Sequence, residues 1–173
     1  MYLLLIKENI VSNVWFIGDI HGGHRNVHKF RSMFNSEEEH FLHVKENFHK
    51  VVKKRDKVFF MGDTAFTLER LQDISTWVCE RKVLICGNHD TDHLPMKVLC
   101  QYFDEVYSLY KWHEFWLSHC PMHPEELRGK KNIHGHVHNA TLNDKRYFNT
   151  SLENTGFYPV DLNFIRSEMR LFE

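Results

Sequence analysis

Histidine is unusually frequent in this 173-residue sequence, which contains 14 of them. It is the commonest metal ligand in proteins and the side chain whose charge changes closest to neutral pH. Several histidines stand with aspartate or asparagine in short polar motifs: DIH at 19–21, GD at 62–63, GNHD at 87–90, LSHCP at 117–121 and GHVH at 135–138. Such side chains can bind metal ions or act as general acids and bases, so these motifs are the candidates for chemistry.

The motifs offer oxygen and nitrogen donors and no obligatory thiolate. The candidate ligands are two aspartates, one asparagine and four histidines: Asp19, His21, Asp63, Asn88, His119, His136 and His138. This donor set suits Mn, Fe, Ni or Zn better than Ca or a structural zinc site built from cysteines. Within DIH and HVH the donors are two residues apart, so extended backbone would point both side chains to one face. The sequence therefore predicts that each pair serves one site.

Short apolar runs precede the first three motifs and predict buried strands. Residues 14–17, 58–61 and 83–86 are each rich in apolar side chains, and each run stops at a glycine followed by a polar residue. Periodic apolar residues between the runs predict amphipathic helices over about 36–54 and 68–78. This alternation is an α/β pattern, in which neighbouring strands bring their terminal loops together at one edge of a sheet. That edge is the expected position of the site.

The second half of the chain predicts further strands. Residues 105–110 and 114–118 are short aromatic-rich runs with a tight connection, which favours a β-hairpin. Strand-like stretches follow at 132–139 and 147–152. The final segment predicts a turn and a short edge strand next to Pro159.

Composition and charge limit the class of protein. Lys and Arg total 22 against 23 for Asp and Glu, a formal net charge of −1, so we expect no strong non-specific binding to nucleic acid or to a membrane. The apolar run at 3–6 is too short for a signal peptide or a membrane span. The four cysteines form no C-x-x-C pair. These features predict a single domain over residues 1–173 with reduced thiols and a cytoplasmic location.

Most of the other histidines are predicted to lie on the surface. On a helical wheel of residues 36–54, three of them fall opposite or beside the apolar stripe: His40, His43 and His49. We expect the same of four histidines outside the motifs: His28, His93, His113 and His123.

The five motifs occur in the order of a known signature. D-x-H, G-D, G-N-H-[DE], H and G-H-x-H, here running from DIH to GHVH, resemble the calcineurin-like metallophosphoesterases. DIHGGH and LSHCP are similar to the small bacterial and phage branch of that family. The resemblance covers about residues 14–138 and implies an α/β fold. That fold is a four-layer α/β/β/α sandwich of two mixed β-sheets flanked by helices, with a dimetal site along one edge.

The resemblance also implies a role for each site residue. The ligands would fall into two sets bridged by Asp63: Asp19, His21 and His138 for one ion, and Asn88, His119 and His136 for the other. Two divalent ions, Mn²⁺ first and Fe, Ni or Zn as alternatives, would share a water and lower its pKa, so that a bridging hydroxide attacks phosphorus. His89 would donate a proton to the leaving alkoxide, and Asp90 would orient His89.

Four further residues are candidates for binding the substrate phosphate. His24 matches a histidine common in this branch, and would either cap the following helix or bind phosphate. Arg128, Lys130 and Lys131 lie between His119 and GHVH, where a rim loop is expected. They would either steer a phosphate or belong to a solvated loop.

The resemblance names a reaction class, phosphoric ester hydrolysis, without naming the substrate. A chain this short with no cap domain leaves an open site that admits a nucleotide or a small phosphodiester. We therefore expect a dimetal phosphodiesterase first and a phosphomonoesterase or phosphoprotein phosphatase second. A non-catalytic scaffold on the same fold is the third alternative, and the oligomeric state stays open.

Overall fold

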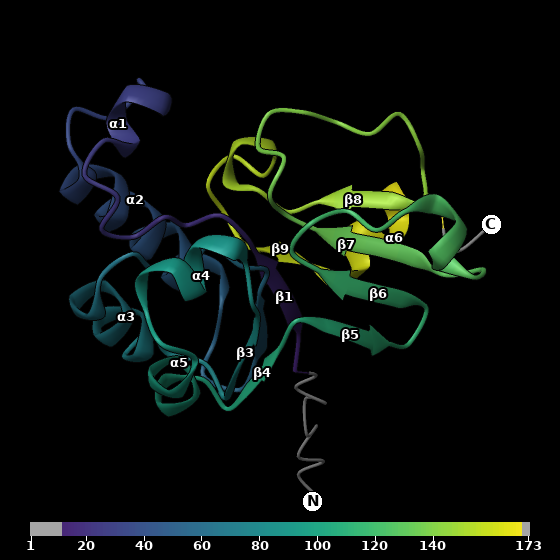
Figure 1. Cartoon of the computed structure of the whole chain (residues 1–173), viewed down its shortest axis with the longest axis horizontal. Coiled ribbons are helices and arrows are strands. Elements are labelled where there is room, and N and C mark those ends of the chain that lie inside the picture. The colour runs from purple at the N-terminus through teal and green to yellow at the C-terminus, as the bar shows by residue number, and fades with distance from the viewer. Residues whose placement is uncertain (1–11, 171–173) are drawn as a thin grey trace, which may run out of the picture.

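The computed structural model describes residues 12–170, so the apolar run at 3–6 lies outside the described residues. Two mixed β-sheets pack face to face (Figure 1). The first has the order β4-β3-β2-β1-β9 and is parallel except for β9. Its strands are β1 (Val14–Ile17), β2 (Lys57–Phe60), β3 (Arg81–Ile85), β4 (Glu105–Tyr107) and β9 (Val160–Asp161).

The second sheet has the order β5-β6-β7-β8, with an antiparallel hairpin followed by parallel pairs. Its strands are β5 (Leu109–Trp112), β6 (Phe115–Ser118), β7 (Lys131–His134) and β8 (Tyr147–Asn149). Two mixed sheets with flanking helices confirm the predicted α/β class.

Helices flank the sheets, and four of them lie on the side of the first sheet that faces away from the second (Figure 1). These are α2 (Glu37–Val51), α3 (Leu68–Ser75), α4 (Asn88–His93) and α5 (Met96–Tyr102). The others are α1 (Val27–Phe30), α6 (Leu162–Glu168), and the 3₁₀ turns η1 (Pro124–Leu127) and η2 (Leu152–Asn154). None of the helices in the described residues is both long and apolar enough to cross a bilayer.

Adjacent residues of the central strands serve two different cores. Phe59 packs between the two sheets with Phe115 and Ile133, whereas its neighbour Phe60 packs under the helices with Phe48. Successive side chains of a strand point to opposite faces, so a strand buried on both sides needs a continuous apolar run. This is why 14–17, 58–61 and 83–86 lack the alternation of a half-exposed strand.

The aromatic segment 105–110 is divided between the two sheets, which the sequence did not predict. Its first part, β4, pairs in parallel with β3, and only its second part, β5, forms the predicted hairpin with β6. Val106 packs against the core under the helices, while Tyr110 packs against the core between the sheets. Both parts are rich in β-forming residues, so their composition does not show the change of sheet at Ser108. The short edge strand after Pro159 is confirmed as β9.

His40 is buried, which corrects its prediction as a surface histidine. Its side chain is 0% exposed, and its Nε2 lies 2.7 Å from Nη1 of Arg31. A guanidinium can only donate, so Nε2 accepts and the His40 ring is neutral. Burial and the neighbouring Arg31 charge lower the pKa of His40 to about 3. The partner comes from a segment outside the helix, which a helical wheel does not include.

We expect His40→Gln to flatten the acid dependence of stability. The folded-state pKa lies below the unfolded value of 6.5, so the unfolded chain binds more protons below pH 6.5 and stability falls as the pH drops toward 3. Glutamine keeps an acceptor for Arg31 and does not titrate. Urea unfolding should show a loss between pH 8 and pH 5 that is smaller by about 2 kcal/mol in the variant. His49→Gln, at an exposed position of α2, is the matched control, and an equal change in both variants would contradict a role for the buried pair.

Candidate metal centre

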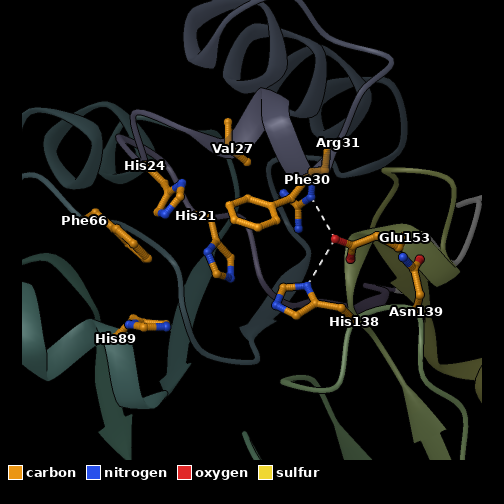
Figure 2. Close-up of a pocket in the computed structure, with 10 residues that line it drawn as sticks. All are labelled: His21, His24, Val27, Phe30, Arg31, Phe66, His89, His138, Asn139 and Glu153. Carbon is orange, nitrogen blue, oxygen red and sulfur yellow. Dashed lines mark hydrogen bonds and ion pairs between the residues drawn. The ribbon is translucent and has the colours of Figure 1, made fainter.

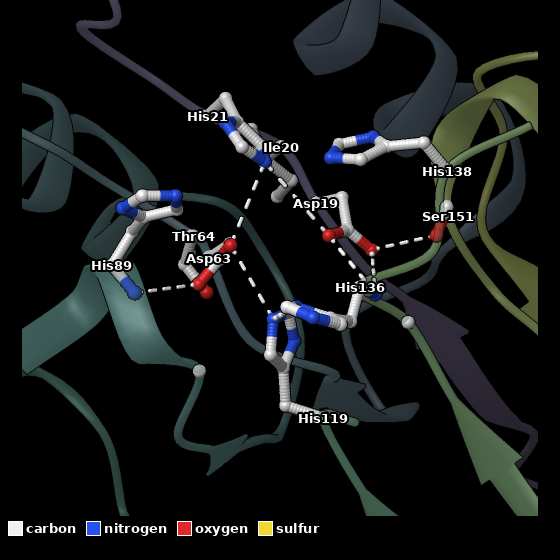
Figure 3. A network of polar contacts seen from close by, with 12 residues as sticks. Asp19, Ile20, His21, Asp63, Thr64, His89, His119, His136, His138 and Ser151 are labelled. Carbon is white, nitrogen blue, oxygen red and sulfur yellow. Dashed lines mark hydrogen bonds and ion pairs between the residues drawn. The ribbon is translucent and has the colours of Figure 1, made fainter. Parts of the chain in front are cut away.

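The carboxyl ends of strands from both sheets meet at one edge, and the predicted ligands lie there (Figure 3). Their loops are hydrogen-bonded to one another, as from the N–H of Asp19 to the Gly62 carbonyl (3.0 Å). Six of the seven predicted ligands form two groups whose ligand atoms lie within 4.8 Å of one another: Asp19, His21 and His138, and Asp63, His119 and His136. Asn88 begins α4 at an exposed position, and its metal role stays a prediction.

Asp63 lies between the two groups. One of its oxygens, Oδ2, is 3.7 Å from Nε2 of His21 and 3.3 Å from Nε2 of His119. The other, Oδ1, accepts a hydrogen bond from the backbone N–H of His89 at 2.9 Å. One carboxylate oxygen therefore faces a ligand from each group, which is the position that a bridging ligand requires.

Outer partners fix which atom each ligand presents. Nδ1–H of His119 donates to the Met61 carbonyl at 2.8 Å, which leaves Nε2 for a metal. Oδ2 of Asp19 accepts from the hydroxyl of Ser151 (2.8 Å) and from the N–H of His136 (3.0 Å). These contacts hold the ligands in place before any ion binds.

The residues fit a pair of divalent ions. Carboxylate oxygens and imidazole nitrogens converge without a thiolate, which is the donor chemistry of Mn, Fe or Zn sites. Nε2 of His21 is buried and has no hydrogen-bond partner in the described part of the chain, although it faces both Asp19 and Asp63. A buried polar atom without a partner is costly unless something binds it, and a cation here would supply the missing interaction.

The charges of the site make metal binding compete with protons. Burial lowers the pKa of His119, but its contact with the Asp63 carboxylate outweighs burial and raises the pKa to about 9. Burial acts to raise the pKa of Asp63, and the contacts with His119 and the His89 N–H reverse this, so its pKa is lowered. A metal ligand must be deprotonated, so an ion that binds His119 displaces its proton.

The donor pairs do not lie on extended backbone as predicted. Five of the ligands have left-handed backbone, with φ between 48° and 72°: Asp19, His21, Asp63, His136 and His138. Turns beyond the strand ends, rather than strand alternation, bring Asp19 and His21 to the same group, whereas His136 and His138 contribute to different groups. Such strained residues persist where surrounding contacts fix them, and they cluster at functional sites.

Glycines next to the ligands leave space that the ligands fill. A Cβ on Gly87 would lie 2.3 Å from Oδ1 of Asp63, and one on Gly135 would lie 2.4 Å from Oδ2 of Asp19. Neither glycine has a positive φ. Their role is therefore to allow a close approach of the carboxylates rather than an unusual backbone.

We expect Gly135→Ala to weaken metal binding about tenfold or more, because its methyl group displaces the Asp19 carboxylate. Titration calorimetry with Mn²⁺ would measure the loss. Gly129→Ala controls for destabilisation away from the site, since a Cβ there meets no atom within 4 Å but its φ of 80° strains the backbone. Equal affinities of Gly135→Ala and the unchanged protein would show that Asp19 does not bind the ion.

Asp90 does not contact the His89 ring, contrary to the prediction. It is 0% exposed, and its oxygens accept from the backbone N–H groups of Asp63 (2.9 Å), Thr64 (2.8 Å) and Gly87 (2.8 Å). Asp90 thus holds the loop that carries Asp63, while the carboxylate near His89 Nδ1 is that of Asp92, at 3.7 Å. The sequence could not distinguish the two because both stand within three residues of His89.

The predicted basic rim lies away from the metal groups. Lys131 begins β7, whereas the ligands follow the other end of that strand, about 13 Å away at 3.3 Å per residue. Lys130 donates to the His113 carbonyl, Lys131 to the Met169 carbonyl, and Arg128 pairs with Glu126. These contacts support the solvated-loop alternative for Arg128 and Lys130, whereas Lys131 is part of β7.

Arg31 and Glu153 support the first group, and no sequence motif indicated either residue. The buried guanidinium of Arg31 donates to the Asp19 carbonyl (2.7 Å), the Ile20 carbonyl (3.3 Å) and Oε1 of Glu153 (2.9 Å). The same Glu153 oxygen lies 3.1 Å from Nδ1 of His138, which leaves Nε2 of that ring for a metal. Arg31 and Glu153 are 122 positions apart in the sequence, which explains why no local pattern reveals the pair.

A cavity of about 420 Å³ opens beside the first group (Figure 2). It is lined by two ligands, by the predicted proton donor, and by seven other residues: His21, His138, His89, His24, Val27, Phe30, Arg31, Phe66, Asn139 and Glu153. His24 is therefore placed where its substrate-binding alternative requires it. No backbone N–H of α1 is bonded to its side chain, so the capping alternative is not supported.

Known proteins are similar to this chain in sequence and in fold. The family described as calcineurin-like phosphoesterase matches residues 12–167. The Gene 66 protein of Mycobacterium phage D29 is 40% identical over 90 residues, which are 50% of this chain and 44% of that protein. This chain thus matches less than half the length of that relative. The protein MJ1445 of Methanocaldococcus jannaschii is 28% identical over 165 residues, 88% of each chain.

A solved structure resembles the whole fold. The crystal structure of AQ665 from Aquifex aeolicus has a TM-score of 0.73 and 25% identity, and the match covers 91% of this chain and 99% of that one. The family match extends over both sheets and all five motifs, and the structure brings candidate ligands from four of these motifs to one edge. This chain belongs to the calcineurin-like phosphoesterase family.

Proposed function

We propose that this phosphoesterase is a metal-dependent phosphodiesterase. The observation that carries this preference is the charge of the cavity wall. Among the described residues that line the cavity, Arg31 is the one Lys or Arg side chain. Its guanidinium already binds Glu153 and the carbonyls of Asp19 and Ile20. A monoester dianion carries one more charge than a diester and needs a further cationic partner, so the cavity favours the diester.

The side chains have separate tasks in this reaction. When bound, two divalent ions would neutralise the phosphoryl oxygens and supply a hydroxide near neutral pH. His89 lines the cavity with its ring centroid 5.9 Å from that of His21, close enough to reach the leaving oxygen of a phosphate held there. Its Nδ1 faces Asp92, which leaves Nε2 to donate the proton.

The proposal also names the metal ion, the cellular location and the substrate. Mn²⁺ is the proposed ion, supported by mixed oxygen and nitrogen donors without thiolate, with Fe, Ni and Zn as alternatives. Four free cysteines suit a reducing compartment and support a cytoplasmic location: Cys79, Cys86, Cys100 and Cys120. The proposed partner is a nucleotide or small phosphodiester.

The test compares bis(p-nitrophenyl) phosphate with p-nitrophenyl phosphate, using metal-stripped protein with and without Mn²⁺, Fe²⁺, Ni²⁺ or Zn²⁺. We expect Mn²⁺-dependent cleavage that is faster for the diester. Preference for the monoester would favour the phosphomonoesterase alternative. Absence of turnover with every ion would leave the scaffold alternative.

A further inference from the structure

One wall of the cavity is aromatic and continues directly from the metal ligands. We name Phe30, His24 and Phe66 the aromatic wall (Figure 2). The His24 ring lies between the other two, with centroids 6.0 Å from Phe30 and 5.0 Å from Phe66. The Phe66 ring also lies 5.1 Å from the ring of the ligand His21. A molecule whose phosphate binds at the metal groups would therefore extend over this wall.

The two ends of the wall differ in how firmly they are held. Phe66 is backed by the His93 ring, stacked at 4.2 Å with an interplanar angle of 21°. Phe30, in contrast, is 79% exposed at the end of the short helix α1. So exposed a ring contributes little to the core, yet it projects over the cavity mouth in Figure 2. Its position favours contact with a bound molecule over a role in folding.

The chemistry of the wall fits a flat heteroaromatic ring. Aromatic rings pair by offset stacking or edge-to-face contact, and every nucleobase has a π-face that can stack on them. The imidazole of His24 between the two phenylalanines gives the wall a polar edge, so the wall suits a flat ring that carries polar atoms.

We propose that the aromatic wall binds the nucleobase of the substrate, so that the phosphodiesterase acts on small nucleotides. The formal charge of −1 gives no general attraction to a nucleic acid backbone, which favours a mononucleotide or dinucleotide over a long strand. This inference rests on the proposed function, because it takes the bound molecule to be the substrate. The binding measurement below does not depend on turnover.

The test uses two ligands that differ only in the base. Titration calorimetry on Mn²⁺-loaded protein compares adenosine 5′-(methyl phosphate) with ribose 5-(methyl phosphate), two diesters, with hydrolysis assayed in parallel. We expect the nucleotide to bind about tenfold more tightly or better, because base stacking on aromatic side chains has this magnitude. Phe30→Ala should remove most of that difference and leave the binding of ribose 5-(methyl phosphate) unchanged. Phe66→Ala, whose ring also lies 5.1 Å from that of His21, should lower the affinity of the nucleotide more than that of the sugar phosphate.

Two further variants make the result specific. Phe30→Tyr keeps a flat ring and should keep the base preference, while Phe164→Ala, at a 50% exposed phenylalanine of α6, is the matched control. A 2-aminopurine nucleotide should also lose fluorescence on binding, and Phe30→Ala should reduce that quenching. Equal affinity of both ligands, no measurable binding of the nucleotide, or an equal loss of both ligands in the alanine variants would overturn the proposal.

The outcomes separate this inference from the proposed function. Diester hydrolysis without a base preference would overturn the nucleobase-binding role of the aromatic wall and would leave the proposed phosphodiesterase activity standing. Base-dependent binding without turnover in the presence of any of the metal ions would support the aromatic wall as a nucleotide site and would refute the phosphodiesterase activity.

Discussion

His89→Ala is expected to lower kcat for a diester with an alkyl leaving group by about 10²–10⁴-fold, the usual contribution of a general acid. Its ring lines the cavity beside His21, and an alkoxide is too basic to leave without a proton. A p-nitrophenolate leaves without one, so the same variant should lose far less activity on bis(p-nitrophenyl) phosphate. Rates on both substrates, measured with saturating Mn²⁺, give the ratio that tests the role.

Metal binding must be measured beside these rates. The His89 ring belongs to neither ligand group, so Mn²⁺ affinity by calorimetry should stay within about twofold of the unchanged protein. His123→Ala, at an exposed histidine, is the matched control for removing an imidazole. An equal loss on both substrates would refute proton donation and place His89 in substrate binding. Unchanged rates on both would remove it from the reaction.

Four of the five motifs predicted where six candidate ligands lie, because each motif stands at the end of a strand whose direction fixes the position of that end. Asp19 and Asp63 follow apolar runs of four residues that form the buried parallel strands β1 and β2, which end at the same edge, and His119 follows β6 of the second sheet. The hydrophobic pattern therefore determined both the fold class and the edge that carries the site. The donor types then limited the chemistry.

Residues that act through contacts between distant segments could not be predicted in this way. Asp90 accepts from the backbone of a loop 26 and 27 residues earlier, and nothing in GNHD shows that its carboxylate turns away from His89. The basic rim is a different case, because residues that precede a strand lie at the end opposite to the residues that follow it, so the order of Lys131 and GHVH already separates the two. Phe30 and Phe66 were hidden because an aromatic residue next to a polar motif fits a core equally well.

Glu153→Ala is expected to lower Mn²⁺ affinity about 10- to 100-fold, the usual effect of removing the outer partner of a metal-binding histidine. The carboxylate lies 3.1 Å from Nδ1 of His138 and so fixes which nitrogen that ring presents. Burial acts to raise the pKa of Glu153, and the contacts with His138 and Arg31 outweigh it and lower the pKa to about 2. Glu153 therefore stays charged wherever the ligand histidines can bind a metal.

The same variant should destabilise the metal-free protein by about 3 kcal/mol, because it removes the anionic partner of a buried guanidinium. This value is at the lower end of the usual range, since Arg31 keeps the Asp19 and Ile20 carbonyls as acceptors. Urea unfolding at pH 7 measures the loss. The stabilisation by Glu153 is complete above its unfolded pKa of 4.5 and disappears as the pH falls toward 2, so the two proteins should converge in acid.

Glu153→Gln separates charge from geometry. Glutamine can place an oxygen where Oε1 accepts from both Arg31 and His138, but it carries no charge. Affinity for Mn²⁺ close to that of the unchanged protein would show that Glu153 acts by orienting the His138 ring, whereas a loss as large as that of Glu153→Ala would show that its charge makes His138 a stronger donor. Glu126→Ala, at an exposed carboxylate paired with Arg128, is the control. If Glu153→Ala lowers stability and leaves Mn²⁺ affinity unchanged, Glu153 only neutralises Arg31, and His138 is held by other contacts.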